Sequence, residues 1–149
     1  MKIAFGCDHG GFAAKEKVFE YFDKMGYEVT DYGCFDENSV DYPDVAYPVC
    51  KDVKATSSDF GVLICGTGIG MSIVANKFKG IRCAPCYDEE TAKQAKEHSN
   101  VNVLALPAAY LSTSKAIQIM RVWVASEFLG GRYSERLQMI ADVEKENMK

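Results

Sequence analysis

The sequence predicts an α/β fold in which helices cover both faces of a parallel sheet. Short apolar runs typical of buried strands alternate along the 149 residues with segments whose apolar side chains recur at helical spacing. The connections between these segments are short, which is typical of parallel strands joined by helical crossovers. Because residues 1–149 contain no linker, low-complexity tract or internal repeat, we expect a single doubly wound, three-layer αβα domain, Rossmann-like, with a five-stranded sheet.

The first part of the chain predicts two strands, each followed by a helix. Residues 3–7 form the first expected strand, and residues 12–25 form a helix that Gly26 terminates. Apolar residues at helical spacing mark the expected buried face of this helix, namely Ala14, Val18, Tyr21, Phe22 and Met25. Residues 28–32 predict the second strand, and after a polar loop residues 44–54 predict the second helix.

The second part continues the alternation. Strands are expected over residues 60–64, 81–85 and 101–106, with a helix after Gly70 between the first two. Asp88 is expected to cap the next helix, which carries acidic residues in its first turn and Lys93 and Lys96 later, as the helix dipole prefers. A long helix over residues 112–128 should bury Ile117, Met120, Val124 and Phe128. Gly130-Gly131 ends it, and a last helix capped by Ser134 is expected over about residues 134–149.

Composition excludes several classes of function. A net charge of −4 and a pI of about 5.2 argue against a nucleic-acid partner. No apolar run approaches the roughly 18 residues that a membrane span needs, and the first residues are typical of a strand rather than a signal peptide. The six cysteines do not form a disulfide framework, since several fall inside predicted strands. We therefore expect a cytoplasmic protein.

A thiol and three glycines follow the third predicted strand, in the turn Cys65-Gly66-Thr67-Gly68-Ile69-Gly70. Glycine lets backbone N–H groups approach a ligand closely, and a cysteine before a helix lies where a thiolate is stabilised. The turn therefore predicts chemistry on an anionic or oxyanion-forming substrate. Dinucleotide binding is the alternative, but the spacing is G-x-G-x-G rather than G-x-G-x-x-G, and no Walker lysine is present.

Both histidines of the chain lie at the ends of predicted elements. One interpretation is that each histidine bonds nearby backbone. However, His9 follows Asp8, and a carboxylate can hold the charge and orientation of an imidazole. His98 closes the helix that begins at Asp88. Because this helix runs back from the carboxyl edge of the sheet, His98 should lie at the opposite edge, far from Cys65. If both residues serve one active site, His98 must come from a neighbouring chain.

Two arginines lie four residues apart near the start of the last helix. If the helix extends through Arg132, the guanidinium groups of Arg132 and Arg136 lie on one face and can clamp a phosphate. A solvated surface pair is the alternative interpretation. Both interpretations remain open from the sequence.

The segment Cys83-Ala84-Pro85-Cys86 is a C-x-x-C motif. A helix follows it, so a thioredoxin-like thiol–disulfide role is a second hypothesis for the chain. A single such pair is poor evidence for zinc, and cysteine is often an ordinary buried residue. We expect no bound metal.

Motifs along nearly the whole chain match one known family. They are Gly6-Cys7-Asp8-His9-Gly10-Gly11, Asp41-Tyr42-Pro43, the segment from Ile64 to Gly70, Ala75-Asn76-Lys77, Gly80-Ile81-Arg82, His98 with Asn102-Val103-Leu104, and Gly130-Gly131-Arg132 with Arg136. On these residues the chain resembles type B ribose-5-phosphate isomerases, a family that also includes galactose-6-phosphate isomerase subunits.

The resemblance implies interconversion of ribose 5-phosphate and ribulose 5-phosphate through an enediolate, without metal or cofactor. Cys65 would be the base, with Thr67 and His98 assisting the opening of the sugar ring. Since some members instead use a glutamate where this chain has Met71, the cysteine form is implied. An ordinary thiol is mostly protonated at neutral pH, so the helix after Gly70 is expected to stabilise the thiolate.

The resemblance also implies how the sugar phosphate is held. Hydroxyl and enediolate contacts would come from Asp8, Tyr42 and the backbone amides of Gly66, Gly68 and Gly70. The phosphate would be bound by His9, Arg132 and Arg136. Because the family forms dimers or tetramers with sites between subunits, a homodimer or a tetramer is implied, with the last helix packed on a partner.

Two positions depart from the family pattern. Ser99 follows His98 where the family usually has an asparagine, and we keep Ser99 as a substrate-binding candidate. Pro107-Ala108-Ala109 replaces the usual Gly-x-Arg, whose arginine commonly joins the phosphate site. Preference for a five- or a six-carbon sugar is therefore open, and allose 6-phosphate is the alternative substrate. Galactose-6-phosphate isomerase subunits match less well, since they lack the His98 feature and the paired arginines.

Overall fold

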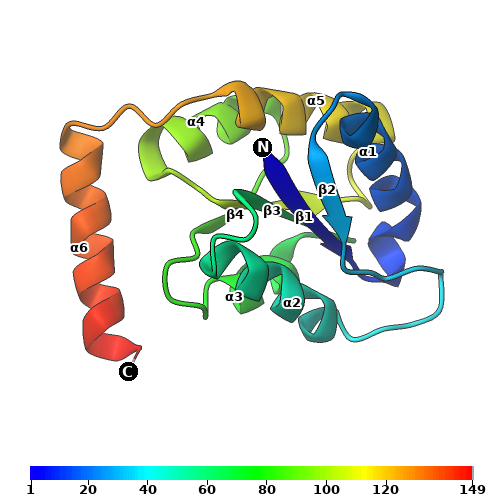
Figure 1. Cartoon of the computed structure of the whole chain (residues 1–149), viewed down its shortest axis with the longest axis horizontal. Helices are drawn as coiled ribbons and strands as arrows, with labels where there is room; N and C mark the ends of the chain where they lie inside the picture. Colours follow the sequence, from blue (N-terminus) through cyan, green and yellow to red (C-terminus); the bar gives the residue numbers. More distant parts are fainter. Residues whose placement is uncertain (149) are drawn as a thin grey trace.

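A parallel sheet forms the centre of the computed structural model, which describes residues 1–148 (Figure 1). The strand order is β2-β1-β3-β5-β4, and all four neighbouring pairs are parallel. The strands are β1 Lys2–Cys7, β2 Glu28–Asp31, β3 Phe60–Cys65, β4 Cys83–Pro85 and β5 Val103–Pro107. This confirms the predicted five-stranded α/β architecture.

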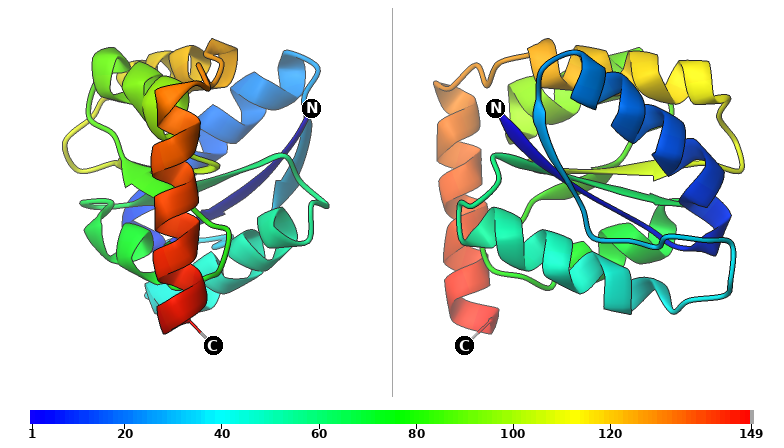
Figure 2. Two further views of the ribbon diagram at one scale, coloured as in Figure 1. Left: turned by 90° about the vertical axis from the view of Figure 1, so that its left-hand side faces the viewer. Right: turned by 45° about the vertical axis from the view of Figure 1, so that its right-hand side comes forward.

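Helices cover the sheet on both faces (Figures 1 and 2). One face packs against α1 Phe12–Lys24, α4 Glu89–Ser99 and α5 Thr113–Ala125, and the other against α2 Tyr42–Lys54 and α3 Ile69–Ala75. The strands β1, β3 and β5 therefore bury side chains in two separate apolar cores. The larger core includes Phe5, Phe22 and Trp123, and the smaller includes Val49, Leu63 and Met71. Burial on both faces explains why the strands have near-continuous apolar runs.

The strand order reverses between β1 and β3. From β1 the chain proceeds to β2 on one side, while β3 lies on the other side and leads toward β5 and β4. Ligands of open α/β sheets bind at the carboxyl ends of the strands at such a switch point. The segments that follow Cys7 and Cys65 meet at this point, since Cys7 pairs with Ile64 in the register of β1 and β3.

The last helix, α6 Arg132–Asn147, stands beside the sheet rather than on either face (Figure 2). No residue of α6 is buried, and Met139, Ile140 and Val143 are all more than half exposed. Among residues 1–148, two hydrogen bonds connect this end of the chain to the rest: Gly80 N–H donates to Glu144 Oε2 at 2.8 Å, and Leu129 N–H donates to the Glu97 carbonyl at 3.1 Å. An amphipathic helix with an exposed apolar stripe is typical of an interface.

Several element boundaries differ from the sequence prediction. The helix expected over residues 112–128 ends at Ala125, so Phe128 lies in the extended segment before α6. On this helix Trp123 is fully buried, whereas Ile117 and Val124, which were expected to be buried, are only partly buried. The last helix begins at Arg132 with Gly131 as its N-cap, so Ser134 is not the cap. Met25 lies beyond α1 and is 59% exposed. Lys149, the end of the expected last helix, lies outside the described residues.

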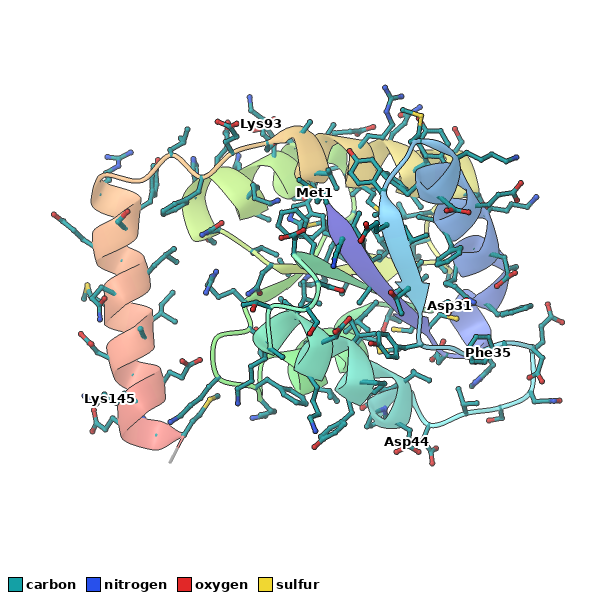
Figure 3. All side chains as sticks on the ribbon, viewed as in Figure 1. Met1, Asp31, Phe35, Asp44, Lys93 and Lys145 are labelled. Atoms are coloured by element: carbon teal, nitrogen blue, oxygen red, sulfur yellow. The ribbon has the colours of Figure 1, made fainter. Side chains whose placement is uncertain are left out.

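The pattern of apolar residues also did not reveal two buried lysines. The Lys15 side chain of α1 is fully buried, and its Nζ lies 2.5 Å from Asp31 Oδ2 at the carboxyl end of β2. Asp31 and Phe35 lie close together there (Figure 3), and the Lys15 ammonium lies 5.4 Å from the centre of the Phe35 ring. The ion pair therefore joins α1 to the end of β2.

Lys96 of α4 is buried, and no carboxylate among residues 1–148 forms an ion pair with it. Its Nζ lies 3.6 Å from the centre of the Phe60 ring and 4.4 Å from that of Trp123. Burial lowers the pKa of Lys96 from its ordinary 10.5 to about 8. The two aromatic faces favour the charged ammonium and offset part of this burial penalty.

We expect Lys96→Met to stabilise the protein at pH 7 by about 1–2 kcal/mol, because methionine fills the site without a buried charge. Between about pH 8 and 10.5 the unfolded chain binds more protons at Lys96 than the folded chain does, so the stability of the wild type rises with pH in this window. The advantage of the variant should therefore be largest below pH 8 and shrink toward pH 10.5, measured by urea denaturation at each pH.

Lys93→Met on the exposed side of α4 is the matched control (Figure 3). It removes the same charge from the same helix and should change the free energy of unfolding by about 0.5 kcal/mol or less. If the difference in unfolding free energy between Lys96→Met and wild type stays constant with pH, the pKa of Lys96 is not lowered in the folded protein.

Within the described residues, no helix is both long and apolar enough to cross a membrane.

Candidate active site

Two backbone turns touch at the carboxyl ends of β1 and β3. Asp8 N–H donates to the Ile64 carbonyl at 3.2 Å, and a Cβ on Gly11 would overlap the same carbonyl oxygen. A Cβ on Gly10 would lie 3.5 Å from the backbone nitrogen of Gly66. The turn after β1, which includes a short 3-10 helix over His9–Gly11, therefore lies directly on the start of the glycine turn after β3. Glycine at position 11 is required because no side chain fits there.

The thiol of Cys65 accepts a hydrogen bond from its own turn. The Gly68 N–H donates to Cys65 Sγ at 3.1 Å, and Cys65 is 5% exposed. Gly68 has a φ of +77°, a left-handed conformation that glycine adopts without strain. This bond holds the sulfur within the turn, in a mostly buried position.

Thr67 and Tyr42 flank the same turn. Ile69 N–H donates to Thr67 Oγ1 at 3.2 Å, which orients the exposed hydroxyl. Tyr42, the first residue of α2, lies over Gly70: a Cβ on that glycine would lie 2.6 Å from the ring carbon Cζ. The helix begins at Tyr42, two residues earlier than predicted, and the structure thereby brings the phenol to the turn. Tyr42 remains 38% exposed, so its ring is accessible to a ligand.

The side chains of Asp8 and His9 each accept a hydrogen bond from a different backbone N–H. Asp8 Oδ1 accepts from Gly11 N–H at 3.2 Å, and His9 Nδ1 accepts from Val40 N–H at 3.3 Å. The expectation that Asp8 orients His9 is therefore wrong, because the Asp8 carboxylate caps the 3-10 turn and the Val40 amide holds the imidazole. Since Nδ1 accepts, the proton of neutral His9 lies on Nε2, from which it can be donated to a ligand.

The remaining predicted residues form a second group around Tyr133. The His98 ring stacks on Tyr133 with 4.4 Å between centres and 7° between planes. The guanidinium carbons of Arg132 and Arg136 lie 5.1 and 5.8 Å from the centre of the same ring. Sequence reasoning missed Tyr133. The signal was its place between the two arginines at the start of α6, since Arg136 follows Tyr133 by three residues and so lies beside it on the helix surface.

The two groups lie at opposite ends of α4. Tyr87, just before this helix, donates its hydroxyl to the Thr67 carbonyl at 3.3 Å, so α4 begins beside the glycine turn. His98 follows Glu89 by nine residues, which places it about 14 Å farther along the helix axis. Ser99 is the last residue of the helix and lies at the same end. As the topology predicts, His98 is remote from Cys65 within one chain.

The C-x-x-C motif does not bring its thiols together. Cys83 packs in the core beside α2 and α3, and Cys86 packs in the core on the opposite face of the sheet. Burial raises the pKa of Cys86 to about 11 and also raises the pKa of Cys83. A thiol–disulfide function for this pair has no support, since residues three apart in a strand point to opposite faces. Within residues 1–148, no three metal-ligating side chains of His, Cys, Asp or Glu come together.

The segment that replaces the expected Gly-x-Arg lies against the glycine turn. Ala108 N–H donates to the Cys65 carbonyl at 2.8 Å, and Ala109 N–H donates to the Gly66 carbonyl at 2.9 Å. The Ala109 methyl thus stands beside Gly66, and a Cβ on that glycine would lie 4.0 Å from it. This chain therefore offers no cation from this segment to a ligand at the turn.

Sequence comparisons relate the whole chain to sugar phosphate isomerases. A family described as Ribose/Galactose Isomerase matches residues 3–140. The chain is 39% identical over 144 residues to ribose-5-phosphate isomerase B of Escherichia coli, with 97% of each covered. It is also 39% identical over 143 residues to a D-erythrulose-4-phosphate isomerase of Pectobacterium atrosepticum, covering 94% of this chain and 93% of that protein.

Solved structures share the fold. Ribose-5-phosphate isomerase B of Clostridium thermocellum is 42% identical with a TM-score of 0.97, covering 98% of this chain and 99% of the other. The enzyme of Mycoplasma genitalium, solved with bound ribulose-5-phosphate, is 37% identical with a TM-score of 0.94, covering 98% and 97% of the two chains. The similarity therefore extends along nearly the whole chain.

Contact between Tyr42 and Gly70 yields a test of the site's geometry. Gly70→Ala should lower the free energy of unfolding by about 1–3 kcal/mol, because the new methyl overlaps the Tyr42 ring. Tyr42→Ala in the same chain removes the overlap. The losses in unfolding free energy caused by the two substitutions should therefore not add in a double-mutant cycle measured by urea denaturation. Gly66→Ala is the control, since its methyl meets nothing closer than 4.0 Å. Additive costs for Gly70→Ala and Tyr42→Ala would show that the ring does not lie over the turn.

Proposed function

Since the chain belongs to the ribose/galactose isomerase family of sugar phosphate isomerases, we propose that it interconverts ribose 5-phosphate and ribulose 5-phosphate with Cys65 as the base. The observation that carries this proposal is the mostly buried Cys65 sulfur, which accepts the Gly68 N–H in a turn flanked by Asp8 and Tyr42. A structural neighbour from Mycoplasma genitalium, solved with ribulose-5-phosphate, supports the choice of substrate.

The reaction moves one proton between two carbons. The Cys65 thiolate removes the proton from C2 of the open aldose, and the electron pair shifts to leave an enediolate. The same thiol then returns the proton to C1, while a proton moves between the two oxygens to complete the ketose. Backbone N–H groups of Gly66 and Gly70 are the donors for the enediolate, because amides held in place before charge develops stabilise it most. The Gly68 N–H is directed at Cys65 Sγ instead.

Ring opening and phosphate binding are assigned to the remaining residues. Opening the furanose transfers a proton from the anomeric hydroxyl to the ring oxygen, and Thr67 and His98 serve as the acid and base. Asp8, Tyr42 and Ser99 hold sugar hydroxyls. The phosphate is bound by the free Nε2–H of His9 and by the guanidinium groups of Arg132 and Arg136.

The separation along α4 supports a site completed by a second copy of the chain. Cys65, Asp8 and His9 lie at one end of the helix, while His98, Ser99, Arg132 and Arg136 lie at the other. A homodimer, or a tetramer built from it, joins the two groups from different subunits. The exposed apolar stripe of α6 and an adjoining hollow of about 420 Å³, lined in part by Ile81 and Val101, provide the surface for a partner.

Allose 6-phosphate is the second candidate substrate. The observation that favours it is the Ala109 methyl beside Gly66, which leaves space and removes a cation at the turn. The relationship to a D-erythrulose-4-phosphate isomerase indicates that sugars of other lengths are used within the family. A coupled isomerase assay over aldose phosphates of five and six carbons decides between the two substrates.

Cys65→Ala should abolish isomerisation, with turnover falling at least about a thousandfold, because the base is lost. Binding of ribose 5-phosphate should remain within a few fold in calorimetry, because the phosphate is held elsewhere. Cys86→Ala, which removes a buried thiol outside the turn, should keep its turnover. Retained activity in Cys65→Ala would refute the assignment of the base.

Mixed subunits test the shared site. Cys65→Ala and His98→Ala chains, each inactive alone, should regain activity when they are unfolded together and refolded, because one of the two sites in each heterodimer is then intact. With random assembly, half of the dimers are mixed and about a quarter of the wild-type activity is expected. The absence of rescue in preparations shown by mass spectrometry to contain mixed dimers would contradict the arrangement.

A further inference from the structure

Tyr87 lies between the glycine turn and α4, outside the residues assigned above. It follows β4 at the carboxyl edge of the sheet and precedes Asp88, whose side chain caps α4 by accepting from Thr91 N–H at 2.7 Å. On its other side, Cys86 N–H donates to the Ala105 carbonyl at 3.1 Å. The backbone around Tyr87 is thus held on both sides, while its ring remains 44% exposed.

The Tyr87 hydroxyl contacts the peptide group that serves Cys65. It donates to the Thr67 carbonyl oxygen at 3.3 Å, and this carbonyl shares one peptide unit with the Gly68 N–H that donates to Cys65 Sγ at 3.1 Å. In a trans peptide the C=O and N–H point to opposite sides. Tyr87 and Cys65 are therefore joined through a single amide, with the hydroxyl on one side and the sulfur on the other.

Hydrogen bonds in such a chain strengthen one another. A donor at the carbonyl oxygen polarises the amide and makes its N–H a stronger donor, by an estimated 10–30% per bond. The effect is greatest when the final acceptor is charged, as a thiolate is. Thr67 cannot turn this peptide away easily, because its Oγ1 already accepts from Ile69 N–H at 3.2 Å.

We propose that Tyr87 is a positioning residue for Cys65, which orients and polarises the Thr67–Gly68 peptide and so favours the thiolate. The importance of this effect for catalysis rests on the proposed role of Cys65 as the base. The effect on the sulfur itself does not, since it depends only on the contacts of the turn.

Tyr87→Phe isolates the hydroxyl, because the ring and its packing remain. Without the hydroxyl, the Gly68 N–H is a weaker donor and the thiolate forms at higher pH. The midpoint of the pH dependence of Cys65 alkylation should rise by about 0.3 unit, which corresponds to roughly twofold slower alkylation below the midpoint. In turnover, kcat should fall by a similar factor with the KM for ribose 5-phosphate unchanged, since the hydroxyl acts through the peptide that contacts Cys65.

The experiment measures iodoacetamide modification of Cys65 from pH 6 to 10, with the modified peptide quantified by mass spectrometry so that the other cysteines do not interfere. Tyr47→Phe is the matched control: Tyr47 is also exposed, and it packs on Phe78 on the outer side of α2. This control should leave both the midpoint and kcat unchanged. An unchanged midpoint in Tyr87→Phe, or the same shift in Tyr47→Phe, would overturn the proposal.

The measurements distinguish a purely structural role of Tyr87 from a failure of the proposal that Cys65 is the base. If Tyr87 only supports the fold, Tyr87→Phe lowers the melting temperature without moving the alkylation midpoint, which also overturns the proposal. If Cys65 is not the base, Cys65→Ala keeps its turnover, while the alkylation midpoint of Tyr87→Phe still shifts. The two ideas can thus fail separately.

Discussion

The close approach of two backbone turns, after β1 and after β3, is the constraint on which the candidate site depends. Asp8 N–H bonds the Ile64 carbonyl, and Gly11 lies so near that carbonyl that no side chain fits. Neighbouring parallel strands bring their carboxyl ends to one edge, but they do not by themselves bring the following loops into contact. The glycines allow this contact. As a result Asp8 and His9 lie beside the turn that carries Cys65.

Further contacts of the same kind assemble the rest of this edge. Tyr42 lies over Gly70, the Val40 amide holds His9, and the segment after β5 bonds the Cys65 and Gly66 carbonyls. In the last two cases a backbone group without a partner inside its own element is satisfied by a neighbouring loop. The thiol is consequently surrounded by atoms whose positions several elements determine together.

Helix α4 separates the two groups of candidate site residues. Its first turn touches the glycine turn through Tyr87, and its last turn presents His98 to Tyr133 and the arginines of α6. A rigid helix cannot bring its two ends together, so within one chain the residues at its two ends remain apart. A site that needs both groups calls for a second chain. The exposed apolar side chains of α6 fit this requirement, since such a stripe is costly to leave in water.

Sequence alone determined the parallel α/β fold and nearly every element, because alternating apolar runs and helical periodicity reflect burial on two faces of a sheet. It also identified the glycine turn, and the topology separated His98 from Cys65. Only the tertiary structure decided what the polar side chains do: Lys15 pairs with Asp31, Lys96 lies between aromatic rings, and Val40 rather than Asp8 holds His9. It also placed Tyr87 beside the glycine turn and Tyr133 on His98. The physical reason is that apolar burial repeats with the period of a helix or strand, whereas a hydrogen bond or ion pair depends on where one atom of a distant element comes to lie.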